Sequence, residues 1–545
     1  MATGAQLLVR MLKQEGVKHL FTLSGLHIAP IYAACVEEGI QVIDTRHEQA
    51  AAHAADASAR LTRSLGVACV TAGPGVTDAL TGIANAFAAS SPVLLLGGAA
   101  PTFNAGRGSL QEMEQVDLFT RITKWSDRIP APDRVTTYMA KAFRTMMTGR
   151  MGPVFLEVPW DVLSNGCEDE SLPTGYRTRA RSPGDPAYVA KALALFEKAE
   201  KPAIIAGSSI WWDDASEALA AFAAKAGAPV YLNGSGRGCL ADDHPLFFTQ
   251  TRKEALAEAD VVLICGTPLD FRLGYGAGIG AEATLVQVDG DPLEIGRNRH
   301  VEIGILGDSR SVLQQLESGL SRKEGRNASW LAELRARETK KAQKQAVFEA
   351  SEQVPVHHFR LARELANVAR AAGDSIFVAD GGNWVAIAAK VIGLRGAGRW
   401  LDPGPLGCLG VGAPFAIAAK LLHPDKPVFV IQGDGSFGLN GFDFETALRF
   451  KLPMVCVVGN DAAWGQIRLP QVQFHGAEFS PGTLLAPTRY DRVVEALGGY
   501  GELVTEPSQI RGALERAVAS NTVACVNVMI DPDAPAQSGA QGYAI

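Results

Sequence analysis

The sequence predicts an α/β protein of three domains, each built on a parallel sheet flanked by helices. At 545 residues the chain is too long for a single hydrophobic core. Short apolar runs alternate with amphipathic runs along its whole length, which is the pattern of repeated βα units. Two polar stretches, at 164–186 and 321–345, interrupt this alternation. They divide the chain into domains at 1–165, 186–325 and 356–545.

The first domain opens with an amphipathic helix that stops at Gly16 and lacks the features of a signal peptide. Buried strands are expected at 17–23, 40–45, 67–72 and 92–97, and helices at 48–61 and 76–89. The second domain has strand patterns at 201–207, 259–266 and 283–291, and the third at 375–382 and 525–530. The stretch 164–186 is typical of a linker, and 321–345 predicts a charged helical connector.

Composition excludes several classes of protein. The 47% apolar and 20% charged fractions are those of an ordinary globular protein. A net charge of −7 argues against nucleic acid as a partner, and the absence of an 18-residue apolar run argues against a membrane span. The 8 cysteines form no CxxC pair, which favours reduced thiols and a cytoplasmic protein.

The strongest chemical signal lies in the third domain, where PVFVIQGDGSF and LPMVCVVGNDAAWG flank an amphipathic segment. Each apolar run predicts a strand that ends in an acidic turn, one at Asp434 and the other at Asp461. Because neighbouring parallel strands end at one edge of the sheet, the two carboxylates are expected to converge there. Such oxygen ligands suit Mg²⁺, and Gly435 would let a phosphate approach the backbone. A GDG alone is more often a plain turn.

A second signal lies in the first domain. The segment IDTRHEQAAAHAADASAR places Glu48 where a strand gives way to a helix, and a Gly-Pro-Gly turn opens the next helix at 73–75. From local sequence alone, Glu48 could simply be a first-turn carboxylate that complements the helix dipole.

Taken together, these segments resemble thiamine diphosphate enzymes over essentially the full length of the chain. The resemblance implies an N-terminal pyrimidine-binding domain, a central Rossmann-like domain and a C-terminal diphosphate-binding domain. It also implies that Mg²⁺ is held by the side chains of Asp434 and Asp461 and the carbonyl of Ala463. The family usually has asparagine where this chain has Asp461, so Asn460 remains an alternative ligand. The positions implied near the diphosphate are Gly382, Asn383, Gly433, Gly435 and Ser436.

The same resemblance implies how the cofactor is activated. Glu48 would hydrogen-bond the aminopyrimidine ring, so that the cofactor's own amino group can accept the C2 proton. Leu409 matches the bulky residue that supports the bent cofactor, and Gly407 matches the glycine whose carbonyl contacts the amino group. On local evidence alone, Leu409 would be an ordinary core residue.

Two residues indicate the reaction. His27 lies where benzaldehyde lyase-like acyloin lyases carry a catalytic histidine, and it could take a proton from a 2-hydroxyl group. Gln111 matches a glutamine shared by acyloin lyases, acetolactate synthases and 2-hydroxyacyl-CoA lyases, whereas oxalyl-CoA decarboxylases have tyrosine there. We therefore expect reversible cleavage of a short 2-hydroxyacyl-CoA to formyl-CoA and an aldehyde or ketone. The alternatives are a benzaldehyde lyase-like acyloin lyase and acetolactate synthase.

The rest of the molecule supports less definite expectations. The resemblance implies a homodimer or homotetramer with active sites shared between subunits, and an acyl-CoA as the substrate. Bound FAD is not expected. The central segment NGSGRGCL (233–240) with Arg237 could contact an ADP or CoA moiety or be structural. The tail at 531–545 could be a lid or a frayed terminus. A regulatory protein without activity is the non-enzymatic alternative, but the joint presence of Glu48, Gln111, Leu409 and Asp434 argues against it.

Overall fold

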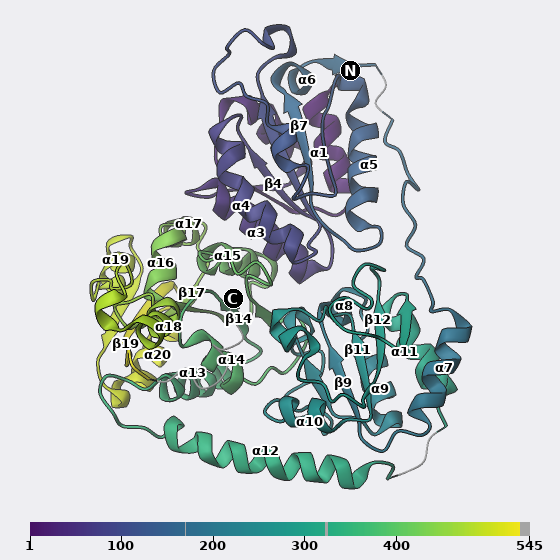
Figure 1. The fold of residues 1–545 in the computed structure, drawn as a ribbon. Helices are drawn as coiled ribbons and strands as arrows, with labels where there is room; N and C mark the ends of the chain where they lie inside the picture. The colour runs from purple at the N-terminus through teal and green to yellow at the C-terminus, as the bar shows by residue number, and fades with distance from the viewer. Residues whose placement is uncertain (169–170, 322–324, 535–545) are drawn as a thin grey trace.

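A computed structural model describes residues 1–168, 171–321 and 325–534. The chain forms three α/β domains, and the long helix α12 (Ala328–Glu349) runs from the second domain to the third (Figure 1). Each domain has one parallel sheet of five or six strands, which confirms the fold class expected from the sequence. Within the described ranges, none of the helices combines the length and the apolar character that a membrane crossing requires.

The first sheet has the strand order β3-β2-β4-β5-β7-β6. Chain order therefore reverses between β2 and β4, and the carboxyl edge at such a switch point is where open sheets bind ligands. The strands are β2 (His19–Thr22), β3 (Gln41–Asp44), β4 (Gly66–Val70), β5 (Val93–Ala99), β6 (Trp125–Arg128) and β7 (Val154–Pro159). The helices are α1 (Gly4–Gln14), α2 (Ala29–Glu38), α3 (Glu48–Thr62), α4 (Pro74–Ala88), α5 (Val135–Met147) and α6 (Trp160–Ser164).

The central sheet has the order β10-β9-β11-β12-β13. Arg237, in the loop that follows β10, contacts the third domain. The Arg237 guanidinium donates to the carbonyl of Ala389 and lies 4.4 Å from the ring centroid of Trp400. The strands are β9 (Pro202–Ala206), β10 (Val230–Leu232), β11 (Val261–Cys265), β12 (Thr284–Asp289) and β13 (Ile303–Leu306). The helices are α7 (Pro186–Phe196), α8 (Ser208–Trp212), α9 (Ser216–Ala226), α10 (Arg252–Glu258) and α11 (Ser309–Gly319). The Arg237 side chain thus joins two domains.

The third sheet has the order β15-β14-β16-β17-β19-β18, and Gly433 of β16 is in register with Gly459 of β17. Its strands are β14 (Ile376–Ala379), β15 (Trp400–Leu401), β16 (Val428–Gly433), β17 (Met454–Asn460), β18 (Tyr500–Val504) and β19 (Val523–Met529). Its helices are α13 (His358–Ala372), α14 (Val385–Val391), α15 (Gly412–Leu422), α16 (Asp434–Asn440), α17 (Asp443–Arg449), α18 (Gly465–His475), α19 (Tyr490–Ala496) and α20 (Ile510–Ala519).

Several elements differ from the sequence-based expectation. The charged connector is helical, but it begins at Ala328 rather than 321. The amphipathic segment between β16 and β17 forms two short helices, α16 and α17, which are separated by Gly441 and Phe442. Strands β6 and β18 were not expected. Both lie at a sheet edge and are half-buried, so they lack a continuous apolar run.

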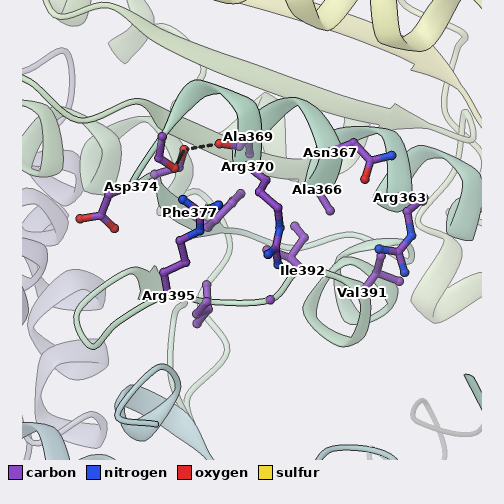
Figure 2. Close-up of a pocket in the computed structure, with 14 residues that line it drawn as sticks. Arg363, Ala366, Asn367, Ala369, Arg370, Asp374, Phe377, Val391, Ile392 and Arg395 are labelled. Atoms are coloured by element: carbon purple, nitrogen blue, oxygen red, sulfur yellow. Dashed lines mark hydrogen bonds between the residues drawn. The ribbon is translucent and has the colours of Figure 1, made fainter. Parts of the chain in front are cut away.

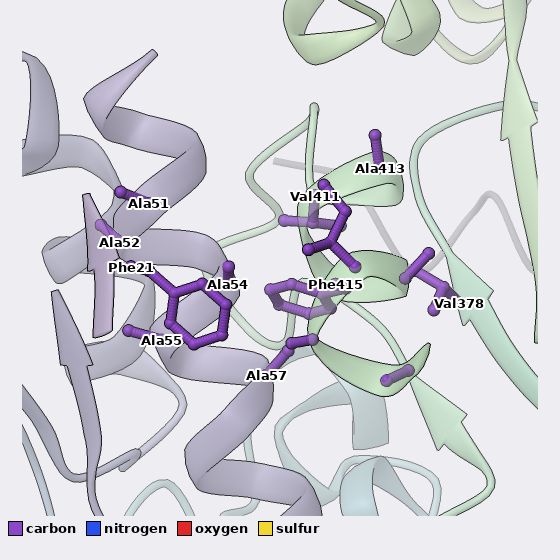
Figure 3. Close-up of a cluster of buried hydrophobic side chains, with 14 of the residues drawn as sticks. Phe21, Ala51, Ala52, Ala54, Ala55, Ala57, Val378, Val411, Ala413 and Phe415 are labelled. Carbon is purple, nitrogen blue, oxygen red and sulfur yellow. The ribbon is translucent and has the colours of Figure 1, made fainter. Parts of the chain in front are cut away.

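The first and third domains of the chain share one hydrophobic core. Alanines on one face of α3 pack against Phe415 and Val411 at the start of α15, as Figure 3 shows. Small side chains let the two helices approach closely. Beside this contact, the buried Arg60 donates to both oxygens of Asp56 at 2.7 and 2.6 Å and to the carbonyl of Asp402 at 2.6 Å. The helix that begins at Glu48 is therefore fixed against the third domain.

We expect Phe415→Ala to weaken this shared core. The side chain is fully buried, and its loss would leave a cavity that costs about 3–5 kcal/mol. Urea unfolding followed by circular dichroism should show an earlier transition. Phe474→Ala is the matched control, because that ring is 75% exposed. Equal midpoints for the two variants would show that the α3–α15 contact contributes little stability.

Candidate active site

Two carboxylates, one buried and one half-buried, meet at the carboxyl edge of the third sheet. Asp434 begins α16 directly after β16, and Asp461 directly follows β17. Their carboxyl groups are close enough to share a hydrogen bond. Asp434 also accepts backbone N–H bonds from Gly435 at 2.9 Å and from Ala463 at 3.2 Å. The strand register therefore produces the convergence that the spacing of the two motifs predicted.

This acidic pair lacks a compensating positive charge. In the described part of the chain neither carboxylate takes part in an ion pair, and Asp461 Oδ2 is buried without a hydrogen-bond partner. Burial raises the pKa of both groups, and the pKa of Asp461 is raised further by the neighbouring Asp434. Two like charges with an orphaned oxygen form a suitable ligand set for a hard divalent cation.

Asn460 is occupied elsewhere. Its amide Nδ2 donates to the Thr488 carbonyl at 3.0 Å and to Asn527 Oδ1 at 3.1 Å, and its Oδ1 accepts from the backbone of Ala462 at 3.1 Å. Both the Nδ2 and the Oδ1 of Asn460 are therefore used within the protein, and the side chain is fully buried. Asn460 therefore ties β17 to its surroundings, and Asp461 is the better placed of the two alternatives as a metal ligand.

Glycines bring backbone close to the acidic pair. A side chain at Gly382, where φ is +144°, would come 2.6 Å from the Gly433 nitrogen, and one at Gly435 would come 2.5 Å from the Trp464 ring. The Asn383 amide Nδ2 is buried without a partner, so a donor remains available here. Ser436 instead uses its hydroxyl within the fold, donating to the carbonyls of Gly381 and Gly433 at 2.9 and 3.1 Å. These features suit an anionic group such as a diphosphate.

The loop before α15 brings the two remaining candidates of this domain to the same edge. Leu409 is half-buried, and a side chain at Gly381 would overlap its Cδ2 atom. Gly407 is exposed with φ +70°, and nothing lies within 4 Å of the position its Cβ would take. The side chain of Leu409 therefore rests against the turn that follows β14.

Glu48 lies at the carboxyl edge of the first sheet. A side chain at Gly75 would come 3.2 Å from Glu48 Oε1, so the carboxyl group lies against the Gly-Pro-Gly turn. Burial raises its pKa, and the nearby Asp78 raises it further. Ligand atoms of His47, Glu48 and Asp78 lie within 4.8 Å of one another, but His47 and Asp78 are exposed. A raised pKa favours the protonated form of this carboxyl group, which is the form that can donate a proton.

His27 lies beside the same turn. Its Nδ1 is 3.1 Å from Thr71 Oγ1, just before the Gly-Pro-Gly segment, and its Cβ packs on Gly98 at the end of β5. Partial burial lowers its pKa, so the imidazole is neutral at pH 7 and can act as a base.

Gln111 completes this edge. It adopts a left-handed conformation with φ +62°, and a side chain at Gly73 would come 2.8 Å from its carbonyl oxygen. Gln115, which the sequence reading missed, accepts from the Gly73 N–H at 3.1 Å and donates to the Gly98 carbonyl at 2.7 Å. Gln115 thus fixes the turn against β5, and the structure brings Glu48, His27 and Gln111 to one turn.

A small cavity of about 20 Å³ opens beside Gln111. Its wall includes Ala72, Ala99, Ala100 and Ala105, together with Arg128. Arg128 is already paired with Glu157, which is fully buried. The cavity is therefore small, and its wall mixes alanines with the polar side chains of Gln111, Glu112 and Gln115.

A second cavity, of about 50 Å³, lies away from this site at the amino end of β14 (Figure 2). Arg363 and Arg370 on its wall are paired with Glu349 and Asp242. It adds nothing to the edge that carries Asp434. The expected lid at the C-terminus begins within 531–534 but otherwise falls on 535–545, outside the described residues.

Comparison with known proteins identifies the family. Three models of the thiamine pyrophosphate enzymes match: the N-terminal TPP binding domain over residues 2–118, the central domain over 189–316 and the C-terminal TPP binding domain over 380–528. A probable acetolactate synthase of Mycobacterium bovis is 39% identical, covering 97% of this chain and 96% of its own length. The 2-hydroxyacyl-CoA lyase 2 of Bos taurus is 37% identical over 93% of this chain and 86% of its own, and that of Homo sapiens is 35% identical over 93% and 86%. The chain therefore belongs to the thiamine pyrophosphate enzyme family.

Proposed function

We propose that this enzyme reversibly cleaves a short 2-hydroxyacyl-CoA to formyl-CoA and an aldehyde or ketone. The observation that supports this choice is the cavity beside Gln111. A space of about 20 Å³ admits a substituent of only a few atoms, since roughly 10–15 Å³ holds one water molecule. Because Glu157 already neutralises Arg128, this cavity offers no free cation for a second carboxylate. A neutral, short carbonyl compound fits it better than a 2-oxo acid.

The cofactor would be held from both domains. Asp434 and Asp461 with the Ala463 carbonyl would hold Mg²⁺, and Asn383 and the N–H groups near Gly433 and Gly435 would contact the diphosphate. Leu409 and Gly407 would support the rings. When bound, thiamine diphosphate supplies the nucleophilic carbon and the electron sink for breaking a bond next to a carbonyl.

The protein's own groups would handle the protons. Glu48, whose pKa is raised by burial, would hold or donate a proton at the aminopyrimidine ring of the bound cofactor. His27 takes the proton of the substrate's 2-hydroxyl as the carbon–carbon bond breaks. Its Nδ1 faces Thr71, which leaves Nε2 for this task. The Gln111 amide orients the same hydroxyl group and excludes other orientations of the substrate.

The active site is proposed to lie between subunits, with the first domain of one copy meeting the third domain of another. Large apolar side chains are exposed near the acidic pair, among them Leu406, Leu439 and Phe442, the last at 69%. A second copy that covers them would also complete the cofactor site, as a homodimer or within a homotetramer. An ADP or CoA moiety in the central domain remains part of this proposal. Arg237 is not proposed to bind this moiety, because its guanidinium already donates a hydrogen bond to the carbonyl of Ala389.

Acetolactate synthase is the second candidate, because a relative with that name is 39% identical to this chain. The two reactions, and that of a benzaldehyde lyase-like enzyme, differ in substrate rather than in cofactor chemistry.

A substrate panel tests the proposal. Enzyme loaded with thiamine diphosphate and Mg²⁺ is incubated with short 2-hydroxyacyl-CoAs, acyloins or pyruvate, and products are separated by chromatography. We expect formyl-CoA from the first class, with rates that fall as the 2-substituent lengthens. Glu48→Gln is the control and should lower the rate by about two orders of magnitude or more. Acetolactate from pyruvate with no formyl-CoA would refute the lyase assignment.

The pH profile tests His27. Burial lowers the pKa of this histidine, so the neutral base persists below the usual histidine range and is lost as pH falls through that lowered pKa. We expect kcat/KM to decline on the acidic side only below about pH 6.5. His27→Gln should lower kcat/KM by about 10²–10⁴-fold and remove this limb. An unchanged limb in the variant would assign it to another group.

Removal of one carboxylate tests the metal site. Asp461→Ala should weaken Mg²⁺-dependent binding of thiamine diphosphate by at least about tenfold, or 1.4 kcal/mol, in calorimetry. The cofactor-free variant should also melt at a higher temperature, because Asp434 no longer faces a like charge. Asp425→Ala, at an exposed position, is the control. Full affinity in Asp461→Ala, with loss in Asn460→Ala, would move the ligand to Asn460.

A further inference from the structure

A third carboxylate, that of Asp380, lies behind the proposed cofactor site. It directly follows β14 and is only 4% exposed. Its two oxygens accept three backbone N–H bonds: from Gly381 at 2.6 Å, from Gly410 at 3.0 Å and from Gly412 at 2.8 Å. Among the residues that the structure describes, no cation pairs with it. Burial raises its pKa to about 6.

These bonds connect three pieces of backbone that are distant in sequence. Gly381 begins the turn after β14, Gly410 follows Leu409 directly, and Gly412 is the first residue of α15. The opposite side of the same loop is held by Asn440, whose Nδ2 donates to the Gly410 carbonyl at 2.8 Å. Because Asn440 ends α16, which begins at Asp434, this contact links the Leu409 loop to the helix of the acidic pair.

The chemistry of the clamp requires a carboxylate. Three N–H donors converge on two oxygens, so an amide would turn one NH₂ group toward a backbone N–H and leave donors unpaired. A buried carboxylate without a cation, such as that of Asp380, costs free energy, so its contribution to stability does not explain its presence. The N-terminus of α15 offsets part of this cost, because helix N-termini favour negative charge.

We propose that Asp380 is a positioning residue that fixes the loop carrying Gly407 and Leu409 against the turn that precedes Gly382. This inference rests on the roles given to Leu409 and Gly407 in the proposed function. Asp380 acts through the Gly410 and Gly412 amides, since its oxygens are used by backbone. The clamp holds the side chain of Leu409 on Gly381 before any ligand arrives.

The first test uses the cofactor-free protein. Asp380→Asn should raise amide hydrogen exchange at Gly410 and Gly412 by at least about tenfold, measured by mass spectrometry on peptides spanning 403–415. Asp374→Asn is the matched control. Asp374 lies at the other end of β14, on the wall of the cavity in Figure 2, and it pairs with Arg399 and Lys426. Exchange in this control should stay at the unmodified level within the same peptides. Unchanged exchange in Asp380→Asn would overturn the clamp.

A second variant separates positioning from folding. Asn440→Ala loosens the same loop from its other side without altering the carboxylate, so it should speed exchange in the same peptides. If both variants bind thiamine diphosphate within about threefold of the unmodified protein but lose at least tenfold in kcat, the loop positions the cofactor. If kcat is retained despite faster exchange, the positioning role is wrong. If the unmodified enzyme yields no formyl-CoA while exchange responds as expected, the proposed substrate is wrong but the clamp is supported. In that case, the near-ultraviolet circular dichroism of the bound cofactor replaces kcat as the measurement.

Discussion

The arrangement of the candidate site depends on two like charges that the sheet brings together. Gly433 of β16 is in register with Gly459 of β17. Asp434 directly follows β16, and Asp461 directly follows β17. Asp434 is buried, Asp461 is half-buried with its Oδ2 atom shielded from solvent, and no cation among the described residues offsets them. Such a pair is unfavourable without a ligand, and the glycines around it leave room for one. The metal-and-diphosphate assignment follows from this electrostatic deficit more directly than from the motif.

One hydrophobic core within the chain positions both the helix that begins at Glu48 and the loop that carries Leu409. Helix α3 begins at Glu48, and its alanine face packs on α15, whose first residue is held by Asp380. The loop with Leu409 lies directly before α15. The helix that begins at Glu48 and the loop that carries Leu409 are thus both anchored to the same helix pair. If the sites are shared between subunits as proposed, these two elements of one chain would serve two different cofactor sites, and this contact would link those sites.

The sequence predicted the parts of this structure that depend on local pattern. Apolar runs identified the buried central strands, and the GDG turn identified the edge at which Asp434 and Asp461 meet. Local pattern could not predict β6 or β18, because edge strands carry polar residues. It also could not reveal Gln115 or Asp380, whose partners lie 17 to 42 residues away. Nor could it choose between Asn460 and Asp461, since that choice depends on the distant Thr488 and Asn527.

In the proposed function, the cavity beside Gln111 would receive the substituent of the substrate. The cavity there is bounded by alanines, and its arginine is held by a fully buried glutamate. Freeing Arg128 for a substrate carboxylate would leave Glu157 buried and unpaired, which is costly. The proposed short substituent would fit this cavity, and the proposed coenzyme A moiety would have to extend in another direction because about 20 Å³ cannot hold it. The proposal of a short 2-hydroxyacyl thioester therefore rests on this cavity, and condensation of two oxo acids stays the alternative because of the relative that is 39% identical.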